Sequence, residues 1–295
     1  MDAGRNLSLR MRVLVTGAGG QLGQELVAVL SADGGGARGA EVVGADRTRL
    51  DVTDRAAVHE VLASLRPEVV VHAAAWTAVD DCETDPDRAF LVNALGTRHL
   101  AEAARTVGAH VCYISTDYVF DGHSSRPYLE WDATNPLSVY GRSKLAGEAE
   151  LGPEATVVRT SWVSGRHGSN LVKTVLRLLA EERPLRFVAD QRSRPTFTAA
   201  LAPVVRRLAT ERRPGLFHVT NQEDATRYDL ARAVVALAGG DPGRVRPIAT
   251  KEVVPAPPAA RPAYSVLDNA ALRLSGLPLL PPWQDSLEQL VRELL

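Results

Sequence analysis

A tyrosine and a lysine four positions apart, Tyr140 and Lys144, are the residues whose types and spacing point most directly to chemistry. Side chains at positions i and i+4 lie on one face of an α-helix, so the phenol and the ammonium can reach the same ligand. An adjacent ammonium favours phenolate and lowers the pKa of a tyrosine from about 10 toward neutrality, where it exchanges protons. Together with Thr116 and the glycine-rich turn upstream, the pair predicts hydride transfer to or from a sugar-sized carbonyl, with a solvated helix face as the alternative interpretation.

A glycine-rich turn near the N-terminus predicts where a nucleotide cofactor binds. An aliphatic run over residues 12–16 breaks at this turn, and a helical pattern follows over 21–31. In dinucleotide-binding folds, such glycines allow a tight bend and close approach of the pyrophosphate, which lies at the helix N-terminus. The residues expected to contact the cofactor here are Gly17, Gly19, Gly20, Gln21, Leu22 and Gly23.

The residues after the second predicted strand, 41–45, bear on the identity of the cofactor. Asp46 is placed to bind both ribose hydroxyls of NAD, whereas Arg47 beside it can hold the 2′-phosphate of NADP. The sequence leaves NADH and NADPH equally open. Asp51 and Val52 follow where the adenine is expected, although an N-cap for the next helix explains Asp51 as well.

Small and hydroxylated residues follow the next two predicted strands. Ala73, Ala74 and Ala75 leave room for a cofactor to pass, although plain helix packing also explains three alanines. Thr116 ends the fourth strand, at the edge of the sheet where ligands bind in open α/β folds, and its hydroxyl can hydrogen-bond a substrate carbonyl. Threonine is also common in strands for reasons of packing alone.

Strands and helices alternate along the first half of the chain, and this alternation predicts the fold class. We expect an α/β protein, with a Rossmann-type doubly wound parallel sheet and helices on both faces. Residues 11–165 are expected to form the dinucleotide-binding domain. The expected apolar strands are 12–16, 41–45, 69–72, 110–115 and 156–160, and the expected helices are 21–31, 85–107 and a helix containing Tyr140.

The second half of the chain is less regular and predicts a smaller C-terminal lobe. We expect residues 166–295 to form mainly a substrate-binding lobe, partly interleaved with the first domain. Residues 1–10 are expected to be a disordered extension, with Met11 as an alternative start. The segments expected to be regular are helices over 170–181, 198–209 and 228–238 and a strand over 215–219, with a proline-rich stretch at 247–262.

Composition argues against several classes of function. The 295-residue chain has a net charge of −1 and scattered arginines, which disfavours nucleic-acid binding. It contains no apolar segment of the ~18 residues that a membrane helix requires, and its first residues do not form a signal peptide. Cys82 and Cys112 lack metal-ligand spacing, and a reduced, cytoplasmic compartment fits them best.

Several motifs resemble those of the dTDP-4-dehydrorhamnose reductase family, within the extended short-chain dehydrogenases/reductases. The resemblance implies an enzyme that uses NADPH or NADH to reduce the C4 ketone of dTDP-4-dehydro-L-rhamnose to dTDP-L-rhamnose, as a monomer or homodimer. It runs from residue 11 to the C-terminus and is carried by VTGAGGQLG (15–23), LDVTD (50–54), HAAAWTAVDDCE (72–83), STDYVFDG (115–122), NPLSVYGRSKLAGE (135–148), RTSWV (159–163), DQRSRPT (190–196) and RPAYSVLD (261–268).

The resemblance also implies roles for individual residues. Thr116, Tyr140 and Lys144 match the catalytic triad, in which the tyrosine donates the proton and the lysine holds the nicotinamide ribose. Asn93 matches an asparagine that supports the site, although a solvated helix face explains it nearly as well. The residues implied to bind the sugar nucleotide are Thr77, Val79, Thr116, Asp117, Tyr118, Trp162, Asn170, Gln191, Thr196 and Arg261.

Other interpretations stay open at this point. Trp162 is equally explained as a core residue and Arg261 as a surface residue. Related 4,6-dehydratases carry an Asp-Glu pair after the threonine, where this chain has Asp117 and Tyr118, so elimination lacks a proton carrier. The competing functions are a 4-ketoreductase of antibiotic biosynthesis, of the dihydrostreptose synthase type, and a non-catalytic regulatory nucleotide-binding subunit like the one that accompanies methionine adenosyltransferase.

A metal site is not expected. Some relatives form a dimer through a divalent ion bound by carboxylates, and Glu25 matches the first ligand position. Ala199 stands where a second glutamate would be. We therefore assign no metal.

Overall fold

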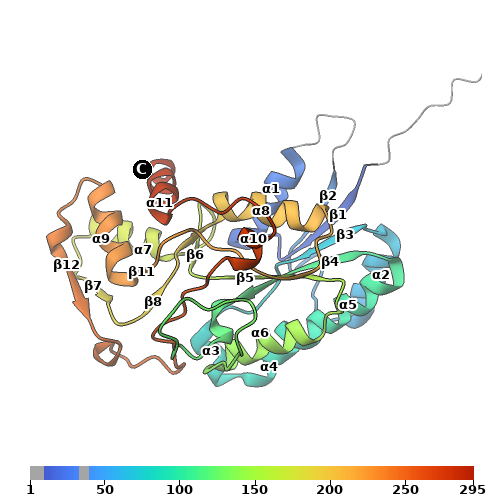
Figure 1. Ribbon diagram of the computed structural model, residues 1–295, viewed down its shortest axis with the longest axis horizontal. Helices are drawn as coiled ribbons and strands as arrows, with labels where there is room; N and C mark the ends of the chain where they lie inside the picture. Colours follow the sequence, from blue (N-terminus) through green and yellow to red (C-terminus); the bar gives the residue numbers. More distant parts are fainter. Residues whose placement is uncertain (1–9, 33–39) are drawn as a thin grey trace, which may run out of the picture.

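A six-stranded parallel β-sheet forms the centre of the molecule (Figure 1). The computed structural model describes residues 10–32 and 40–295, so the expected extension at 1–10 lies outside the described residues except for Arg10. The strand order is β10-β5-β4-β3-β1-β2. The chain adds β2 on one side of β1 and the later strands on the other side, which confirms the predicted doubly wound class. The strands are β1 (Arg12–Thr16), β2 (Glu41–Ala45), β3 (Val69–His72), β4 (His110–Thr116), β5 (Thr156–Thr160) and β10 (Gly215–His218).

Apolar side chains alternate along the strands and build a core on each face of the sheet. Val13 and Val15 of β1 pack with residues of α1 and α8. Leu14 lies between them in sequence and packs on the opposite face, with α2 and α5, because successive strand residues point to opposite sides. The helices that cover the sheet are α1 (Gln21–Ala32), α2 (Arg55–Leu65), α5 (Gly96–Val107), α6 (Val139–Ala149) and α8 (Thr198–Thr210).

The helix predicted over 85–107 is interrupted in the structure. A π-helical turn, η2 (Leu91–Leu95), separates α4 (Pro86–Phe90) from α5, and α3 (Val79–Thr84) precedes them. Asn93 lies in this turn and is 1% exposed. Such turns occur frequently at functional sites.

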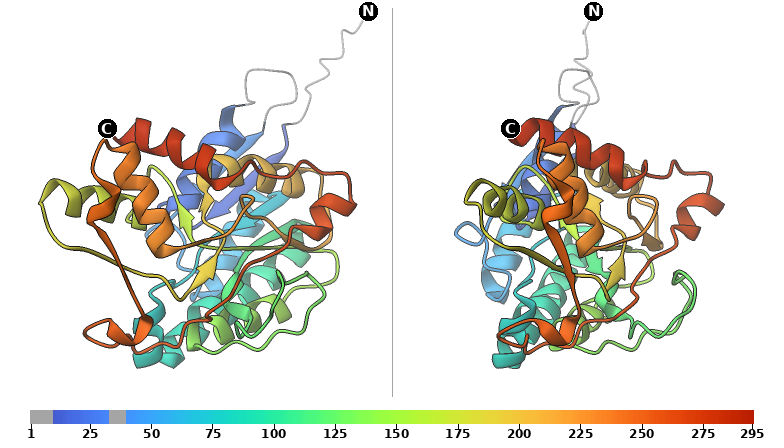
Figure 2. Two further views of the ribbon diagram at one scale, coloured as in Figure 1. Left: turned by 60° about the vertical axis from the view of Figure 1, so that its left-hand side comes forward. Right: turned by 90° about the vertical axis from the view of Figure 1, so that its left-hand side faces the viewer.

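The C-terminal lobe lies beside the main sheet (Figure 2). It has an apolar core of its own. Between β9 and β11 the chain returns to the main sheet as α8 and β10. The elements of the lobe are α7 (Leu171–Ala180), β7 (Leu185–Val188), α9 (Arg227–Leu237), β12 (Val245–Ile248) and α11 (Trp283–Leu294), with two pairs of short strands, β6 (Val163–Ser164) with β9 (Thr196–Phe197) and β8 (Arg192–Ser193) with β11 (Ala225–Thr226). The remaining short elements are η3 (Asp117–Val119), η4 (Pro242–Arg244), η5 (Thr250–Glu252) and α10 (Ala270–Leu274).

Polar side chains fix where the helices near the site begin. Ser138 caps α6 by accepting the backbone N–H of Gly141 at 3.1 Å. Asp54 caps α2, so the interpretation of Asp51 as that N-cap is wrong. Asp51 instead accepts the backbone N–H of Thr53 at 3.0 Å and stabilises the preceding turn.

Candidate active site

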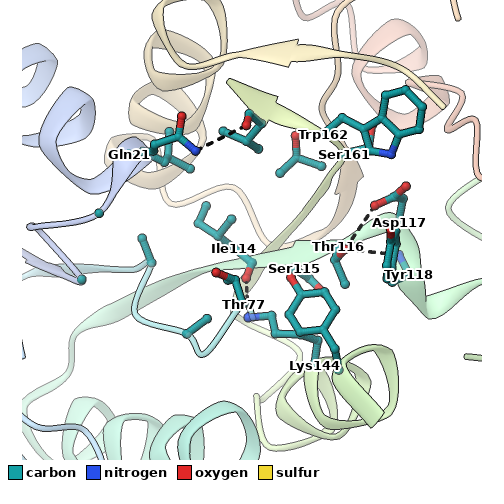
Figure 3. A pocket seen from close by; sticks show the side chains of 18 of the residues that line it. Gln21, Thr77, Ile114, Ser115, Thr116, Asp117, Tyr118, Lys144, Ser161 and Trp162 are labelled. Atoms are coloured by element: carbon teal, nitrogen blue, oxygen red, sulfur yellow. Dashed lines mark hydrogen bonds between the residues drawn. The ribbon is translucent and has the colours of Figure 1, made fainter. Parts of the chain in front are cut away.

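The carboxyl ends of β1, β3, β4 and β5 border a cavity of about 480 Å³ (Figure 3). This is the edge at which open α/β sheets bind ligands. In Figure 3, Gln21 and Trp162 lie across the cavity from Lys144. The predicted residues that line this cavity are Gly17, Gly20, Gln21, Leu22, Gly23, Ala73, Ala75, Thr77, Val79, Thr116, Asp117, Tyr118, Tyr140, Lys144 and Trp162.

The three candidate catalytic residues come from two elements. Thr116 is the last residue of β4, and Tyr140 and Lys144 lie one turn apart on α6. The Lys144 ammonium donates to the carbonyl oxygen of Ile114 at 2.7 Å. Burial lowers the pKa of Lys144 to about 7, so this side chain titrates near neutral pH.

The expected lowering of the tyrosine pKa by the ammonium is wrong for this structure. Burial raises the pKa of Tyr140 above its ordinary value, and a hydrogen bond with the Thr116 hydroxyl opposes that rise. Lys144 is directed at the Ile114 carbonyl and lies 3.9 Å from the centre of the Tyr113 ring. The Tyr140 phenol therefore stays protonated at neutral pH, which is the form that donates a proton.

A buried ion pair holds the helix of the candidate triad against the sheet. Glu148 lies one turn beyond Lys144 on α6 and accepts from the Arg159 guanidinium at 2.6 and 2.9 Å. Glu148 also accepts from the Ser115 hydroxyl at 2.5 Å, beside Thr116. The carboxylate raises the pKa of Lys144 and so opposes the effect of burial. This pair was not predicted, although Glu148 ends the motif that contains Tyr140.

Asn93 connects the π turn to α6 and to the segment after β3. Its amide oxygen accepts the backbone N–H of Trp76 at 2.8 Å, and its amide nitrogen donates to the Trp76 carbonyl at 3.1 Å. The same nitrogen donates to the Ser143 hydroxyl at 2.9 Å. Because Ser143 directly precedes Lys144 on α6, these bonds help to fix the helix that carries the triad.

The glycine turn is shaped for close approach of a dinucleotide. Gly17 has a φ of +68°, and a Cβ there would lie 2.6 Å from the Ala74 nitrogen. A Cβ on Gly23 would lie 2.1 Å from the Gly17 carbonyl oxygen, so α1 packs directly on the turn. The free backbone N–H groups at the start of α1 fit a pyrophosphate.

A second cavity, of about 410 Å³, extends from this turn to the end of β2. Asp46 accepts the backbone N–H groups of Thr48 and Arg49 through one carboxylate oxygen, Oδ1, at 3.0 and 3.1 Å. Arg47 is exposed and lies 3.3 Å from Asp51. The cavity thus offers an acceptor for ribose hydroxyls and a cation for a 2′-phosphate, which fits NADH and NADPH. The predicted residues that line it are Gly17, Gly19, Gly20, Asp46, Arg47, Asp51, Val52, Ala73, Ala74 and Ala75.

Two arginines converge on Tyr118 beside the main cavity. The Arg227 guanidinium lies 4.7 Å from the centre of the Trp162 ring. Burial raises the pKa of Tyr118, and the nearby charges of Arg227 and Arg261 oppose that rise. Arg261 is held by the Asp80 carboxylate at 2.6 and 2.9 Å. Arg227 forms no ion pair with a carboxylate among the described residues, so its charge is available to an anionic ligand. Arg227 lies outside the motifs described above, and Asp80 lies within the motif at 72–83 but was given no role there.

A third cavity, of about 320 Å³, is lined by both arginines and by the predicted residue Gln191. Gln191 donates to the Thr250 hydroxyl at 2.9 Å, and residues 255–258 of the proline-rich stretch form part of the wall. Guanidinium groups match the geometry of phosphate oxygens. This cavity and its arginines therefore suit a nucleoside diphosphate.

The backbone of Trp162 has a φ of +43°, in the left-handed region that side chains other than glycine avoid. Such a conformation costs roughly 1–3 kcal/mol, and residues that adopt it cluster at functional sites. Trp162 is only partly buried, borders the main cavity and contacts Arg227. These contacts favour a binding role over the core interpretation.

Two predicted contacts lie outside the lining of the three cavities. Asn170 caps α7, and its amide donates to the Gln21 side chain at 2.9 Å and to the Gly165 carbonyl at 2.7 Å. Thr196 is fully buried in β9. Both side chains are engaged in the packing of the lobe, so the structure does not bring them to the candidate substrate site.

The two positions considered for a metal border another cavity, of about 210 Å³. Glu25 and Ala199 both line it, and Arg166 lies 3.4 Å from the Glu25 carboxylate. The carboxylate is therefore paired with a cation of its own chain.

Within residues 10–32 and 40–295, none of the helices combines the length and the apolar character needed to cross a bilayer.

A Rossmann sheet that carries a threonine, a tyrosine and a lysine beside a dinucleotide crevice defines a nicotinamide-dependent reductase of the extended short-chain dehydrogenase/reductase class. The family model described as "RmlD substrate binding domain" matches residues 11–295. With the relatives described next, this match shows that the chain belongs to the dTDP-4-dehydrorhamnose reductase family, as its motifs predicted.

Relatives of known name cover nearly the whole chain. The dTDP-4-dehydrorhamnose reductase of Streptomyces griseus is 45% identical over 289 residues, which cover 95% of this chain and 93% of that protein. The dTDP-4-keto-6-deoxy-D-glucose reductase of Streptomyces niveus is 42% identical and covers 94% and 96%. The crystal structure of dTDP-4-dehydrorhamnose reductase from Bacillus anthracis in complex with NADP is similar with a TM-score of 0.91 at 36% identity, covering 97% of this chain and 100% of that chain.

Proposed function

We propose that this protein uses NADPH or NADH to reduce the C4 ketone of dTDP-4-dehydro-L-rhamnose, giving dTDP-L-rhamnose. The observation that carries the proposal is the position of Thr116 and Tyr140 in one cavity that borders both the glycine turn and Trp162. A ketone in this cavity lies between a dinucleotide crevice and a pair of arginines. The bound reduced nicotinamide supplies the hydride that C4 accepts.

The residues of the chain handle the proton and the developing charge. Tyr140, which burial keeps protonated, donates its proton to the ketone oxygen as the carbon–oxygen double bond becomes an alcohol. When the ketone binds, the Thr116 hydroxyl turns its single proton from Asp117 to the same oxygen and stabilises its negative charge. Lys144 lines the same cavity and would hold the nicotinamide ribose of a bound cofactor.

The lobe supplies the groups that hold the nucleotide. Arg227 and Arg261 bind the diphosphate beside Tyr118, and Trp162 packs against the sugar. Gln191 borders the adjoining cavity, which would take the nucleoside. In this arrangement the dTDP part is recognised separately from the sugar. The oligomeric state that we propose is a monomer or a homodimer.

A second 4-keto sugar is supported by one observation, the 42% identity to the dTDP-4-keto-6-deoxy-D-glucose reductase of Streptomyces niveus. The triad acts only on the ketone, so the choice between sugars rests on the hydroxyls that the pocket pairs. A non-catalytic regulatory subunit is disfavoured, because a binding module has no need of Thr116, Tyr140 and Lys144 together.

The test is oxidation of NADPH and NADH at 340 nm with dTDP-4-keto-6-deoxy-D-glucose, in the presence and absence of the epimerase that forms dTDP-4-dehydro-L-rhamnose. Oxidation that depends on the epimerase supports the proposal, and equal rates without it point to the unepimerised sugar. Tyr140→Phe should lose most of the turnover while it still binds NADPH. Tight cofactor binding without turnover in the unmodified protein would reject a reductase.

A further inference from the structure

Asp117 is a carboxylate with almost no contact with solvent at the edge of the main cavity, and three hydroxyl groups donate to it. Oδ1 accepts from the Thr116 hydroxyl at 3.1 Å. Oδ2 accepts from Ser193 at 3.0 Å and from Ser265 at 2.5 Å. The resemblance to known reductases placed Asp117 among the residues that bind substrate, but its oxygens are already engaged by the protein.

The donors belong to two different parts of the molecule. Thr116 ends the central strand β4, whereas Ser193 lies on β8 in the lobe. The backbone N–H of Ser265 donates to the Arg192 carbonyl at 2.8 Å, so the two serine-bearing segments run side by side. Asp117 therefore joins the lobe that borders the proposed nucleotide site to the residue expected to bind the ketone.

We propose that Asp117 is a positioning residue: it fixes the Thr116 hydroxyl for the ketone and ties that hydroxyl to the placement of the lobe. The proposal rests on the proposed function in one respect, that Thr116 acts on the ketone oxygen. Asp117 itself does not contact the substrate.

The hydrogen bonds around Thr116 explain how Asp117 acts. The Thr116 oxygen accepts the backbone N–H of Tyr118 at 3.2 Å while its hydroxyl donates to Asp117. These two bonds hold the side chain in one rotamer, and it lines the same cavity as Tyr140. From this rotamer the single hydroxyl proton can turn from Asp117 to the ketone oxygen, while the other carboxylate oxygen of Asp117 keeps its two serine donors. Without the carboxylate, only the Tyr118 bond restrains the hydroxyl, and the serines of the lobe lose their shared acceptor.

Kinetics of Asp117→Ala, Asp117→Asn and Thr116→Val, with the double variant Thr116→Val/Asp117→Ala, test this role. We expect Asp117→Ala to lower kcat roughly 10- to 100-fold while KM for the keto sugar changes by less than about 3-fold. Asp117→Asn keeps an acceptor oxygen for Thr116 and should recover most of that loss. In the Thr116→Val background, removing the carboxylate should cost less than about 3-fold in kcat, because Asp117 acts through that hydroxyl.

Two results would overturn the proposal. A rise in KM without loss of kcat would show that Asp117 binds substrate directly. An equal loss of kcat with and without the Thr116 hydroxyl would show a general structural role. NADPH binding and the melting temperature report whether each variant is folded. If Asp117→Ala does not fold, Ser193→Ala/Ser265→Ala retains the carboxylate, removes both donors from the lobe, and should lower kcat with little change in KM.

A crystal structure of Asp117→Asn and of Asp117→Ala separates this proposal from the proposed function. We expect the Thr116 rotamer to be kept in the asparagine variant and lost in the alanine variant. An unchanged Thr116 side chain in Asp117→Ala would refute the positioning role whatever the substrate is. Failure of the unmodified protein to reduce either keto sugar would refute the proposed function without bearing on this geometry.

Discussion

Replacing Glu148 by glutamine tests whether the buried ion pair holds the helix of the triad in place. The glutamine keeps the size of the side chain and one acceptor oxygen, but it removes the negative charge. Arg159, which is 5% exposed in its side chain, is then left as a buried cation without a counter-charge. The change also removes the group that raises the pKa of Lys144.

The expected loss of stability follows from burial. Removing one partner of a buried ion pair costs about 3–5 kcal/mol, and the remaining acceptor oxygen places Glu148→Gln near the lower value. Unfolding entropy of about 2.1 cal/mol/K per residue, over 295 residues, converts a loss of about 3 kcal/mol into a fall in Tm of about 5 °C. Because Lys144 loses a favourable charge, its ammonium should also release its proton at a lower pH.

A matched control, an exposed ion pair, lies at the C-terminal end of the same helix, α6. Glu150 binds Arg98 with two bonds of 2.7 Å, but the Arg98 side chain is 51% exposed. Glu150→Gln should cost less than about 1 kcal/mol, because exposed pairs contribute little. Differential scanning calorimetry at pH 7.5 compares the two variants. Equal shifts in Tm would show that the buried pair stabilises the helix no more than an exposed pair does, and recovery of Tm in Glu148→Leu/Arg159→Met would support the role of the buried charge.

Three further predictions concern the substrate, the cofactor and pH. Arg227→Ala should raise KM for the keto sugar about 10- to 100-fold with kcat within about 3-fold, because it removes a diphosphate contact. Arg232→Ala, an exposed arginine on the same helix, should leave both constants unchanged, and a loss of kcat alone in Arg227→Ala would contradict the assignment. Arg47→Ala should raise KM for NADPH about 10-fold and leave that for NADH within about 2-fold, measured at 340 nm, and equal effects on both cofactors would exclude a 2′-phosphate contact. Burial lowers the pKa of His218 to about 3, below the ordinary value of about 6.5, so the unfolded chain binds the extra proton and stability falls as the pH drops from 6.5 toward 3. His218→Gln should reduce the loss of unfolding free energy between pH 7.5 and 5 by about 2 kcal/mol in urea titrations, and an unchanged pH dependence would contradict the assigned pKa.

The fold could be predicted because its signals are local. Apolar runs bounded by turns gave the strands of the main sheet, and the glycine turn lies between β1 and α1 as expected. The π turn around Asn93 was not predicted, since its sequence is compatible with an ordinary helix. Its geometry is set by the bonds from Asn93 to Trp76 and Ser143, which only the folded chain brings together.

The part of the candidate site that could be predicted is the part whose residues lie at a recognisable spacing on a single helix or turn. Tyr140 and Lys144 share a helix face, but the direction of the ammonium and the raised pKa of the phenol depend on burial by several elements. Arg227 comes from a helix of the lobe and has no motif. Asn170 was assigned to substrate because a helix-capping asparagine and a ligand-binding asparagine look alike in sequence.

The central claim is that the chain transfers a hydride to C4 of a dTDP-linked keto sugar. NADPH carrying deuterium at the transferred position of the nicotinamide tests this directly, with the product analysed by NMR. We expect deuterium at C4 of the reduced sugar, with transfer lost in Tyr140→Phe. A bound cofactor that transfers no deuterium to either keto sugar would contradict it and would favour a nucleotide-binding regulatory subunit.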